Sequence, residues 1–360
     1  MRKKQLLSLS VLFTSTFFCA PTFAQVNVSE LIKSGPEDAT KLADAYLTPL
    51  FKGFGIGLNS GWNYTANAKN AGRFDVRLSL SGALIPPSAK TFDVNKLGLS
   101  SSIRLAQGEN SAAPTVAGSN MIGPRMEIFA DDGQKLENFS LPKGAKLPAI
   151  PTGTLQITVG LPRGIDVTLR GIPQVKLGSD IGSINSMGGG IKLEVLRLIT
   201  GKTVSKILPF DLAVAVGYNE LNYKLPLEVK PSTNAAPKDN NQSTDFADQR
   251  AEAKISAINS ELILSKKLLF FTPFVSVGYN SAKTNITLKG NYPIVTGSTL
   301  LATPTYTTFS DPVKINRSNL SGFRSNVGFQ LNLAAFRFFA AYSMADYNAL
   351  TAGIGLGIGK

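Results

Sequence analysis

Alternating apolar and small residues near the two ends of the chain constrain its fold more than any other feature. Residues 53–64 read GFGIGLNSGWNY and residues 351–360 read TAGIGLGIGK. Successive side chains of a β-strand point to opposite faces. As strands, both segments would have one apolar face and one face of glycine or polar residues. This pattern, repeated along an exported chain, predicts an all-β fold: a closed antiparallel transmembrane-type β-barrel with lipid outside and water inside.

The N-terminus has the features of an export signal. Three basic residues, Arg2, Lys3 and Lys4, precede an apolar stretch over 6–18, and small residues precede a cleavage site after Ala24. We therefore predict a signal peptide over 1–24, which is excluded from the fold. An uncleaved anchor helix is the first alternative. Lipid attachment at Cys19 is the second, although the residues before this cysteine lack the small side chain that a lipoprotein signal normally carries.

Composition excludes most catalytic chemistry. The chain has no His, and its one Cys is lost if the signal is removed. These absences remove the commonest general base and metal ligand, as well as Ser-His and Cys-His nucleophiles. We expect no enzyme activity, no cofactor and no metal site. The net charge of +13 in an exported protein favours anionic lipid headgroups or anionic solutes as partners over nucleic acid.

Residues 25–52 have a helical pattern. Apolar residues recur with three- and four-residue spacing, as at Leu42, Ala45 and Tyr46, and Pro36 followed by acids begins a helix. We expect Pro49 and Gly53 to end it. The segment is interpreted as a periplasmic cap, a plug in the lumen or an ordinary packing helix.

The rest of the chain, 53–360, is interpreted as one barrel domain of about 12–14 strands. No apolar stretch after the signal reaches 18 residues, so a membrane-spanning structure must be a closed barrel. Short turns alternate with long polar loops, as outer-membrane barrels require. Alternation is clearest in segments 74–84, 97–105, 126–128, 155–161, 165–170, 191–195, 210–218 and 323–333. The long loops are predicted near 106–123, 131–152, 226–252 and 290–320.

Charged residues occupy the non-apolar phase of these strands and are predicted to face the lumen. There they would form a structural ion-pair network or line an aqueous path that leans weakly toward anions. In a soluble sandwich the same residues would form a solvated face. The ten residues are Asp75, Arg77, Arg104, Glu127, Asp166, Arg170, Lys192, Glu194, Asp211 and Arg324.

Seven aromatic residues at or near strand ends are predicted to form an interfacial girdle, which is typical of membrane barrels. Aromatic residues at strand ends also occur in soluble sheets. The predicted girdle consists of Trp62, Tyr64, Tyr218, Tyr223, Tyr279, Tyr342 and Tyr347.

Four segments resemble an uncharacterised Bacteroidota family whose members carry signal peptides and are presumed outer-membrane barrels of unknown function. They are DATKLADAYLTPL at 38–50, GFGIGLNSGW at 53–62, FDV at 74–76 and KTFDV at 90–94. The helical segment before a barrel is also distantly similar in architecture to the long-chain fatty-acid transporter family. One departure is the C-terminal Lys360, because the insertion signal of such barrels usually ends in an aromatic residue.

These observations favour a protein of the Gram-negative outer membrane that passes a small or hydrophobic solute passively. A non-conducting structural or surface-adhesion barrel is the alternative from a second class. A soluble periplasmic β-sandwich or lipid-binding protein is the third. Membrane lipid is the expected partner in the first two cases, and the sequence leaves the solute and the oligomeric state open.

Overall fold

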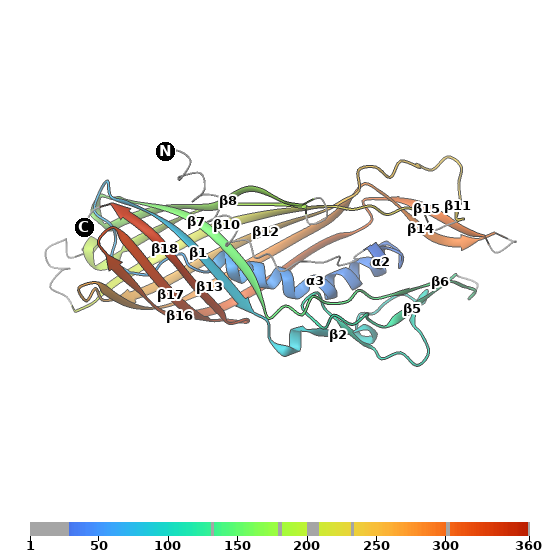
Figure 1. The fold of residues 1–360 in the computed structure, drawn as a ribbon, viewed down its shortest axis with the longest axis horizontal. Coiled ribbons are helices and arrows are strands. Elements are labelled where there is room, and N and C mark those ends of the chain that lie inside the picture. The colour runs from blue at the N-terminus through green and yellow to red at the C-terminus, as the bar shows by residue number, and fades with distance from the viewer. Residues whose placement is uncertain are drawn as a thin grey trace, which may run out of the picture.

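The computed structural model describes residues 29–130, 133–178, 182–199, 209–231, 234–299 and 303–358. Ten of the described strands close into one antiparallel barrel in the order β1-β18-β17-β16-β13-β12-β10-β9-β8-β7 (Figure 1). The predicted signal peptide, Cys19 and Lys360 lie outside the described residues. The barrel strands are β1 (Phe74–Leu84), β7 (Ala149–Leu161), β8 (Ile165–Gly178), β9 (Gly182–Glu194), β10 (Asp211–Pro226), β12 (Arg250–Ser265), β13 (Phe271–Lys289), β16 (Lys314–Leu333), β17 (Phe336–Met344) and β18 (Ala349–Ile358).

The all-β barrel prediction is confirmed, but the described barrel has ten strands rather than 12–14, because several alternating segments lie outside it. Residues 85–148, which we call the loop lobe, contain two small sheets. A third small sheet lies beyond β10 and β13. The small sheets consist of β2 (Thr91–Asp93) with β4 (Ala112–Pro114); β3 (Ile103–Leu105), β5 (Arg125–Phe129) and β6 (Lys135–Ser140); and β11 (Ala236–Pro237), β15 (Pro304–Ser310) and β14 (Asn291–Ser298).

The two ends of the barrel differ in their connections. Turns at 162–164, 266–270 and 334–335 join strands at one end, where β1 begins and β18 ends. We call this the short-turn end, and a helical turn over 195–199 follows β9 there. The opposite, long-loop end carries the loop lobe and the connections over 227–249 and 290–313. In Figure 1 the short-turn end is the left end.

A long helix enters the barrel from the long-loop end (Figure 1). A short helix, α2 (Ser29–Ile32), precedes α3 (Pro36–Asn59), which begins at Pro36 with Glu37 and Asp38 in its first turn. The prediction that Pro49 and Gly53 end the helix is wrong, as is a strand over 53–59. The helix continues to Asn59 and contacts β1, β7, β10, β12, β13 and β16. Glycine has low intrinsic helix propensity, so packing inside the barrel decides this conformation.

The glycines of α3 fit the helix between the walls of the barrel. A Cβ atom on Gly57 would lie 2.1 Å from Thr152 Oγ1, and one on Gly53 would lie 2.5 Å from Ile150 Cγ1, both on β7. On another side of the helix, a Cβ on Gly55 would lie 2.7 Å from Ala282 Cβ on β13. Side chains at these positions would overlap the wall, so the alternation that suggested a strand serves close packing of a helix.

The long strands reverse their amphipathic pattern part-way along their length. On the short-turn half of β13, Val275 and Val277 point outward while Ser276 and Asn280 are buried inside. On its long-loop half the outward residues are polar, as at Lys283, and Ala282, Ile286 and Leu288 are buried inside. The strands β12 and β16 change in the same way. The short-turn half therefore has the apolar outside and polar inside of a transmembrane barrel.

The long-loop half instead contains an ordinary hydrophobic core. Tyr46, Leu42 and Ile56 of α3 are fully buried and belong to one cluster with Ile255 of β12, Leu221 of β10 and residues of the loop lobe. Hydrogen bonds also fix α3 to the lobe. Among them, Tyr46 Oη donates to the Lys143 carbonyl at 2.8 Å, and the Ser100 amide donates to Asp38 Oδ1 at 3.0 Å. The helix thus joins the wall and the lobe into one unit.

Candidate functional site

The lumen of the short-turn half is occupied by the chain that links α3 to β1. We call residues 36–73 the luminal segment, since they run from the long-loop end to the short-turn end inside the barrel. Its last residues are held by backbone contacts to the wall: the Lys192 ammonium donates to the carbonyls of Thr65 at 3.1 Å and Asn67 at 3.0 Å. The Ala68 amide donates to Glu194 Oε2 at 2.8 Å. The segment is therefore anchored by its main chain.

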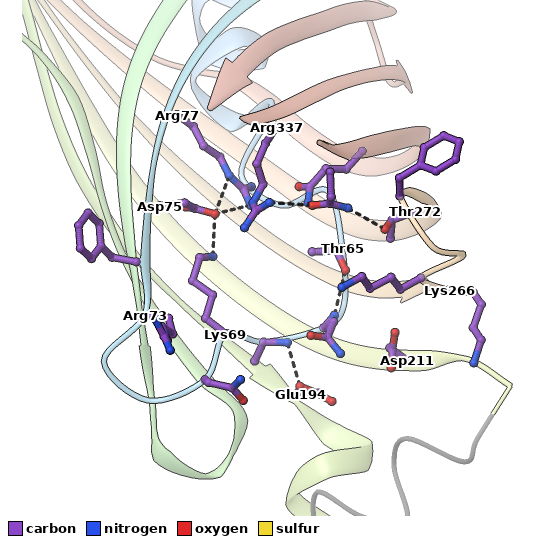
Figure 2. A pocket seen from close by; sticks show the side chains of 18 of the residues that line it. Thr65, Lys69, Arg73, Asp75, Arg77, Glu194, Asp211, Lys266, Thr272 and Arg337 are labelled. Atoms are coloured by element: carbon purple, nitrogen blue, oxygen red, sulfur yellow. Dashed lines mark hydrogen bonds and ion pairs between the residues drawn. The ribbon is translucent and has the colours of Figure 1, made fainter. Parts of the chain in front are cut away.

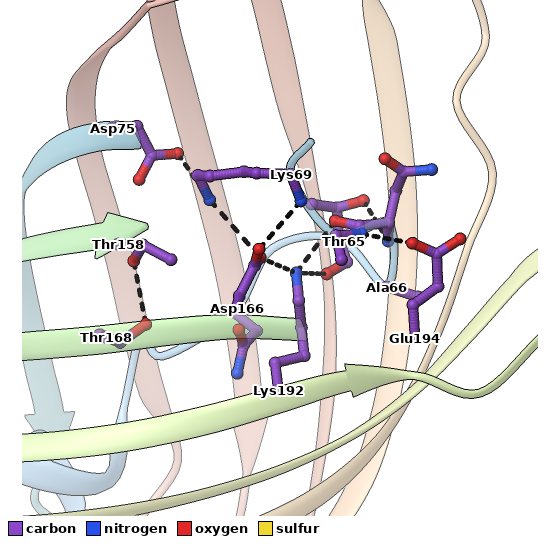
Figure 3. A network of polar contacts seen from close by, with 12 residues as sticks. Thr65, Ala66, Lys69, Asp75, Thr158, Asp166, Thr168, Lys192 and Glu194 are labelled. Carbon is purple, nitrogen blue, oxygen red and sulfur yellow. Dashed lines mark hydrogen bonds and ion pairs between the residues drawn. The ribbon is translucent and has the colours of Figure 1, made fainter. Parts of the chain in front are cut away.

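Charges from three strands meet Lys69 of the luminal segment in one network (Figure 3). The Lys69 ammonium lies 3.1 Å from Asp75 Oδ2 on β1 and 3.6 Å from Asp166 Oδ2 on β8. Asp166 also contacts the Lys192 ammonium of β9 at 3.0 Å, and Arg77 contacts Asp75 at 2.9 Å. Buried charges are tolerated only when they are paired, so wall and segment neutralise each other.

A second set of contacts surrounds Ser60, where α3 ends. Arg170 Nη1 donates to the Ser60 carbonyl at 3.1 Å, and Arg324 Nη2 donates to its hydroxyl at 3.0 Å. The Arg170 guanidinium also lies 4.3 Å from the centre of the Trp62 ring, a cation–π contact. A Cβ on Gly217 of β10 would lie 2.7 Å from this ring. The wall is therefore shaped to admit Trp62.

Of the ten predicted luminal charges, seven lie inside the barrel, one lies at its mouth and two lie outside it. The seven are buried, and Asp211 is half-buried at the short-turn mouth. Arg104 and Glu127 lie in the sheet β3-β5-β6 of the loop lobe, so the prediction that they face the lumen is wrong. Period-two alternation does not distinguish a barrel strand from a strand of a small surface sheet. The seven buried residues are Asp75, Arg77, Asp166, Arg170, Lys192, Glu194 and Arg324.

Glu261 and Lys69 are among the charged residues of the lumen that sequence reasoning missed. Glu261 on β12 accepts hydrogen bonds from Asn63 at 2.8 Å and Ser276 at 3.2 Å. Its position was readable, since Ile258, Leu262 and Leu264 alternate with it on the outward phase. Lys69 had no such signal, because it lies in irregular chain before β1.

The predicted aromatic girdle divides into an outer and an inner group. Tyr218 and Tyr279 are exposed on the outside of the barrel where the long strands reverse their pattern, and Tyr342 is half-buried on β17. Tyr223 lies on the inward phase of β10 and packs against the main core. Trp62, Tyr64 and Tyr347 are buried, so an interfacial position is wrong for them. Tyr64 stacks on Phe339 of β17, with 4.0 Å between ring centres.

A large cavity opens at the short-turn mouth (Figure 2). Its volume is about 1090 Å³, and it lies between the end of the luminal segment and the starts or ends of β1, β9, β10, β13, β16 and β17. Basic residues outnumber acidic ones in its lining. The charged lining residues are Lys69, Arg73, Asp75, Arg77, Glu194, Arg197, Asp211, Lys266, Lys267 and Arg337.

A second cavity of about 440 Å³ lies at the long-loop half between α3, the loop lobe and β16. Asp44 of α3 and Arg317 of β16 line it and form an ion pair at 2.5 Å. Burial raises the pKa of Asp44 despite this pairing. Among the described residues, no helix is long and apolar enough to cross a membrane. No group of three or more Cys, Asp or Glu within the described ranges is placed to bind a metal ion.

Comparisons with known proteins identify one matching family and several distantly similar structures. No curated protein matches the sequence. The translocator domain of the autotransporter NalP from Neisseria meningitidis is 9% identical, with 91% of this chain and 98% of that chain covered and a TM-score of 0.30. The outer-membrane protease OmpT from Escherichia coli is 10% identical, with 83% and 100% covered and a TM-score of 0.35.

The attachment invasion locus protein Ail of Yersinia pestis, solved with a heparin analogue, is 8% identical, with 80% of this chain and 98% of that chain covered and a TM-score of 0.25. The sequence model of one family matches far more completely, over residues 1–358. The chain belongs to this family of unknown function (DUF6588).

Proposed function

We propose that this protein is an outer-membrane barrel closed by its own luminal segment, and that it holds the loop lobe at the cell surface without conducting solutes. The fit of α3 carries this proposal. Its glycines leave no room for a side chain against β7 or β13, and it contacts six strands of the wall. A signal peptide over 1–24 would deliver the chain, and membrane lipid would surround its apolar outer belt.

Electrostatics supports a stably closed state. Asp166, Arg170 and Arg324 are buried and have partners on the luminal segment. Withdrawal of the segment would leave these charges in the lumen without those partners, which is strongly unfavourable unless water replaces them. Passage of a small or hydrophobic solute would therefore require a coupled displacement of the segment and rehydration of the wall.

Single-channel recording tests this function directly. The purified full chain, first checked by membrane fractionation and heat-modifiable gel migration, is reconstituted in planar bilayers. We expect no steady conductance steps at low voltage. The matched variant Asp166→Asn weakens one anchor of the luminal segment and should produce brief openings. Steady, porin-type steps from the unmodified chain would overturn the closed-barrel proposal in favour of passive transport.

Orientation is tested by cysteine labelling in intact cells. In outer-membrane barrels the short turns face the periplasm, so the exposed start of α3 should face the outside. The mature chain has no other Cys if 1–24 is removed. We expect Glu37→Cys to react with an impermeant maleimide in intact cells and Lys267→Cys to react only after permeabilisation. The reverse result would contradict display of the lobe at the surface.

A further inference from the structure

The short-turn mouth holds more positive charge than its own acids neutralise. Seven basic and three acidic side chains line the cavity, an excess of four positive charges. Two of the three acids are already engaged inside: Asp75 pairs with Arg77 and Lys69, and Glu194 accepts from the Ala68 amide. Focusing of a field by a concave site with low-dielectric walls attracts anions. The mouth is therefore electrostatically suited to an anionic group.

One basic side chain is already oriented by the wall of this cavity. Arg337, near the start of β17, is half-buried and donates from Nη1 to Asn332 Oδ1 at 3.2 Å. Asn332 in turn receives a hydrogen bond from Gln330 at 2.8 Å. All three line the cavity. A guanidinium held in this way loses little conformational entropy when it binds a planar or tetrahedral oxyanion.

The rim of the same cavity is apolar and exposed. The turn between β12 and β13 reads Lys266-Lys267-Leu268-Leu269-Phe270, with Leu269 89% exposed and Phe270 55% exposed. Leu269, Phe270 and Phe74 line the cavity beside the basic residues. Apolar residues next to cations at a membrane boundary are typical of contacts with lipid headgroups and the start of their chains.

We propose that the short-turn mouth binds a phosphate-bearing amphiphile. Arg337 and Lys267 contact the phosphate, and its apolar chain lies along Leu269 and Phe270. The phosphate can come from a phospholipid of the adjoining leaflet or from a detached amphiphile, which share this chemistry. The site is at the rim and uses no residue that holds α3, so it does not depend on whether the barrel conducts.

Binding to the purified full chain in neutral detergent tests the site. Isothermal titration compares dodecyl phosphate with inorganic phosphate and with a neutral dodecyl maltoside of the same chain length. The test variant is Lys267→Gln with Arg337→Gln. The control is Lys283→Gln with Lys314→Gln, which removes two exposed charges from the long-loop half. Heat-modifiable migration confirms that each barrel is folded.

We expect saturable binding of dodecyl phosphate that weakens at least about tenfold in the mouth variant and is unchanged in the control. Native mass spectrometry from nanodiscs distinguishes the sources: retained phosphatidylglycerol indicates a leaflet lipid, and tight binding of free dodecyl phosphate without retained lipid indicates a detached amphiphile. Equal affinities of the mouth variant and the control, or equal binding of dodecyl phosphate and dodecyl maltoside, would overturn the proposal.

Discussion

The two halves of this barrel use the same strands with opposite amphipathic patterns. In the short-turn half the outside is apolar and the inside carries charges such as Asp166 and Arg170. In the long-loop half the outside is polar and the inside packs Ile255 and Ile286 against α3. The change occurs near Tyr279 of β13, whose hydroxyl lies 2.5 Å from Ser321 Oγ. Each strand therefore turns its apolar side outward in one half and inward in the other.

This difference means that two kinds of interaction hold the luminal segment. Helix α3 is retained by apolar burial and close contact. Residues 60–73 are retained by ion pairs and hydrogen bonds together with the stacking of Tyr64 on Phe339. Apolar burial is non-directional, but a buried ionic network requires every partner. We therefore expect the two halves to respond very differently to equivalent substitutions. Trp62, the one Trp in the chain, is buried in the lumen and reports on unfolding by fluorescence.

The largest effect is expected from Asp166→Ala in the ionic half. The change leaves the ammonium groups of Lys69 and Lys192 buried without this carboxylate, which costs about 3–5 kcal/mol of unfolding free energy for a buried pair. Urea unfolding in lipid vesicles, followed by Trp62 fluorescence, measures it. Glu109→Ala in the loop lobe, at an exposed acid, is the control and should change stability by less than about 0.5 kcal/mol. Equal effects of the two would contradict an ionic anchor.

The next effect is expected from Ile255→Ala in the apolar half. Ile255 is fully buried in the core, and truncation of such a residue costs about 2–5 kcal/mol through lost burial and a residual cavity. Asn259→Ala, four residues along β12 on the same inward phase, removes a polar side chain of the other half and should cost about 1 kcal/mol. The same unfolding assay compares them. If Asn259→Ala proved the more damaging change, the division of the interior would be wrong.

On the outside of the barrel, we expect the short-turn half to be more sensitive to an added charge than the long-loop half. Val275→Arg places a charge in the apolar belt of β13 and should cost about 2–4 kcal/mol, as charged residues do near the bilayer midplane. Asn285→Arg lies on the same outward phase in the polar half and should be close to neutral. Insertion into vesicles, measured by folded fractions on gels, separates the two. Similar insertion of both variants would argue against lipid around the short-turn half.

The smallest effect concerns the boundary between the halves. Tyr279→Phe removes the hydroxyl that contacts Ser321 but keeps the ring, which packs edge-on against Phe323 at 5.9 Å. We expect a loss of about 1 kcal/mol, the usual net value of one hydrogen bond. Tyr279→Ala, which also removes the ring, should cost more. Stability of both variants in vesicles would show whether this ring marks the interface, and identical losses would contradict a role for it.

Much of the barrel was predictable from the sequence because alternation directly reports a two-faced strand. The segments 165–170, 210–218 and 323–333 are barrel strands as expected, and most of their charges lie inside. Alternation failed where it has more than one cause. The glycines at 53, 55 and 57 alternate because α3 packs closely against β7 on one side and β13 on another. Arg104 and Glu127 lie on neighbouring strands of a small sheet in the loop lobe, outside the barrel.

The sequence by itself determined that the chain would form amphipathic strands with one apolar and one polar side, since this follows from side-chain direction alone. Only the tertiary structure decided that α3 continues to Asn59, that Lys69 joins Asp75 and Asp166, and that Trp62 and Tyr64 lie inside. These features depend on which segment occupies the lumen. Local periodicity carries no information about that choice, because it is made by contacts between residues far apart in the chain.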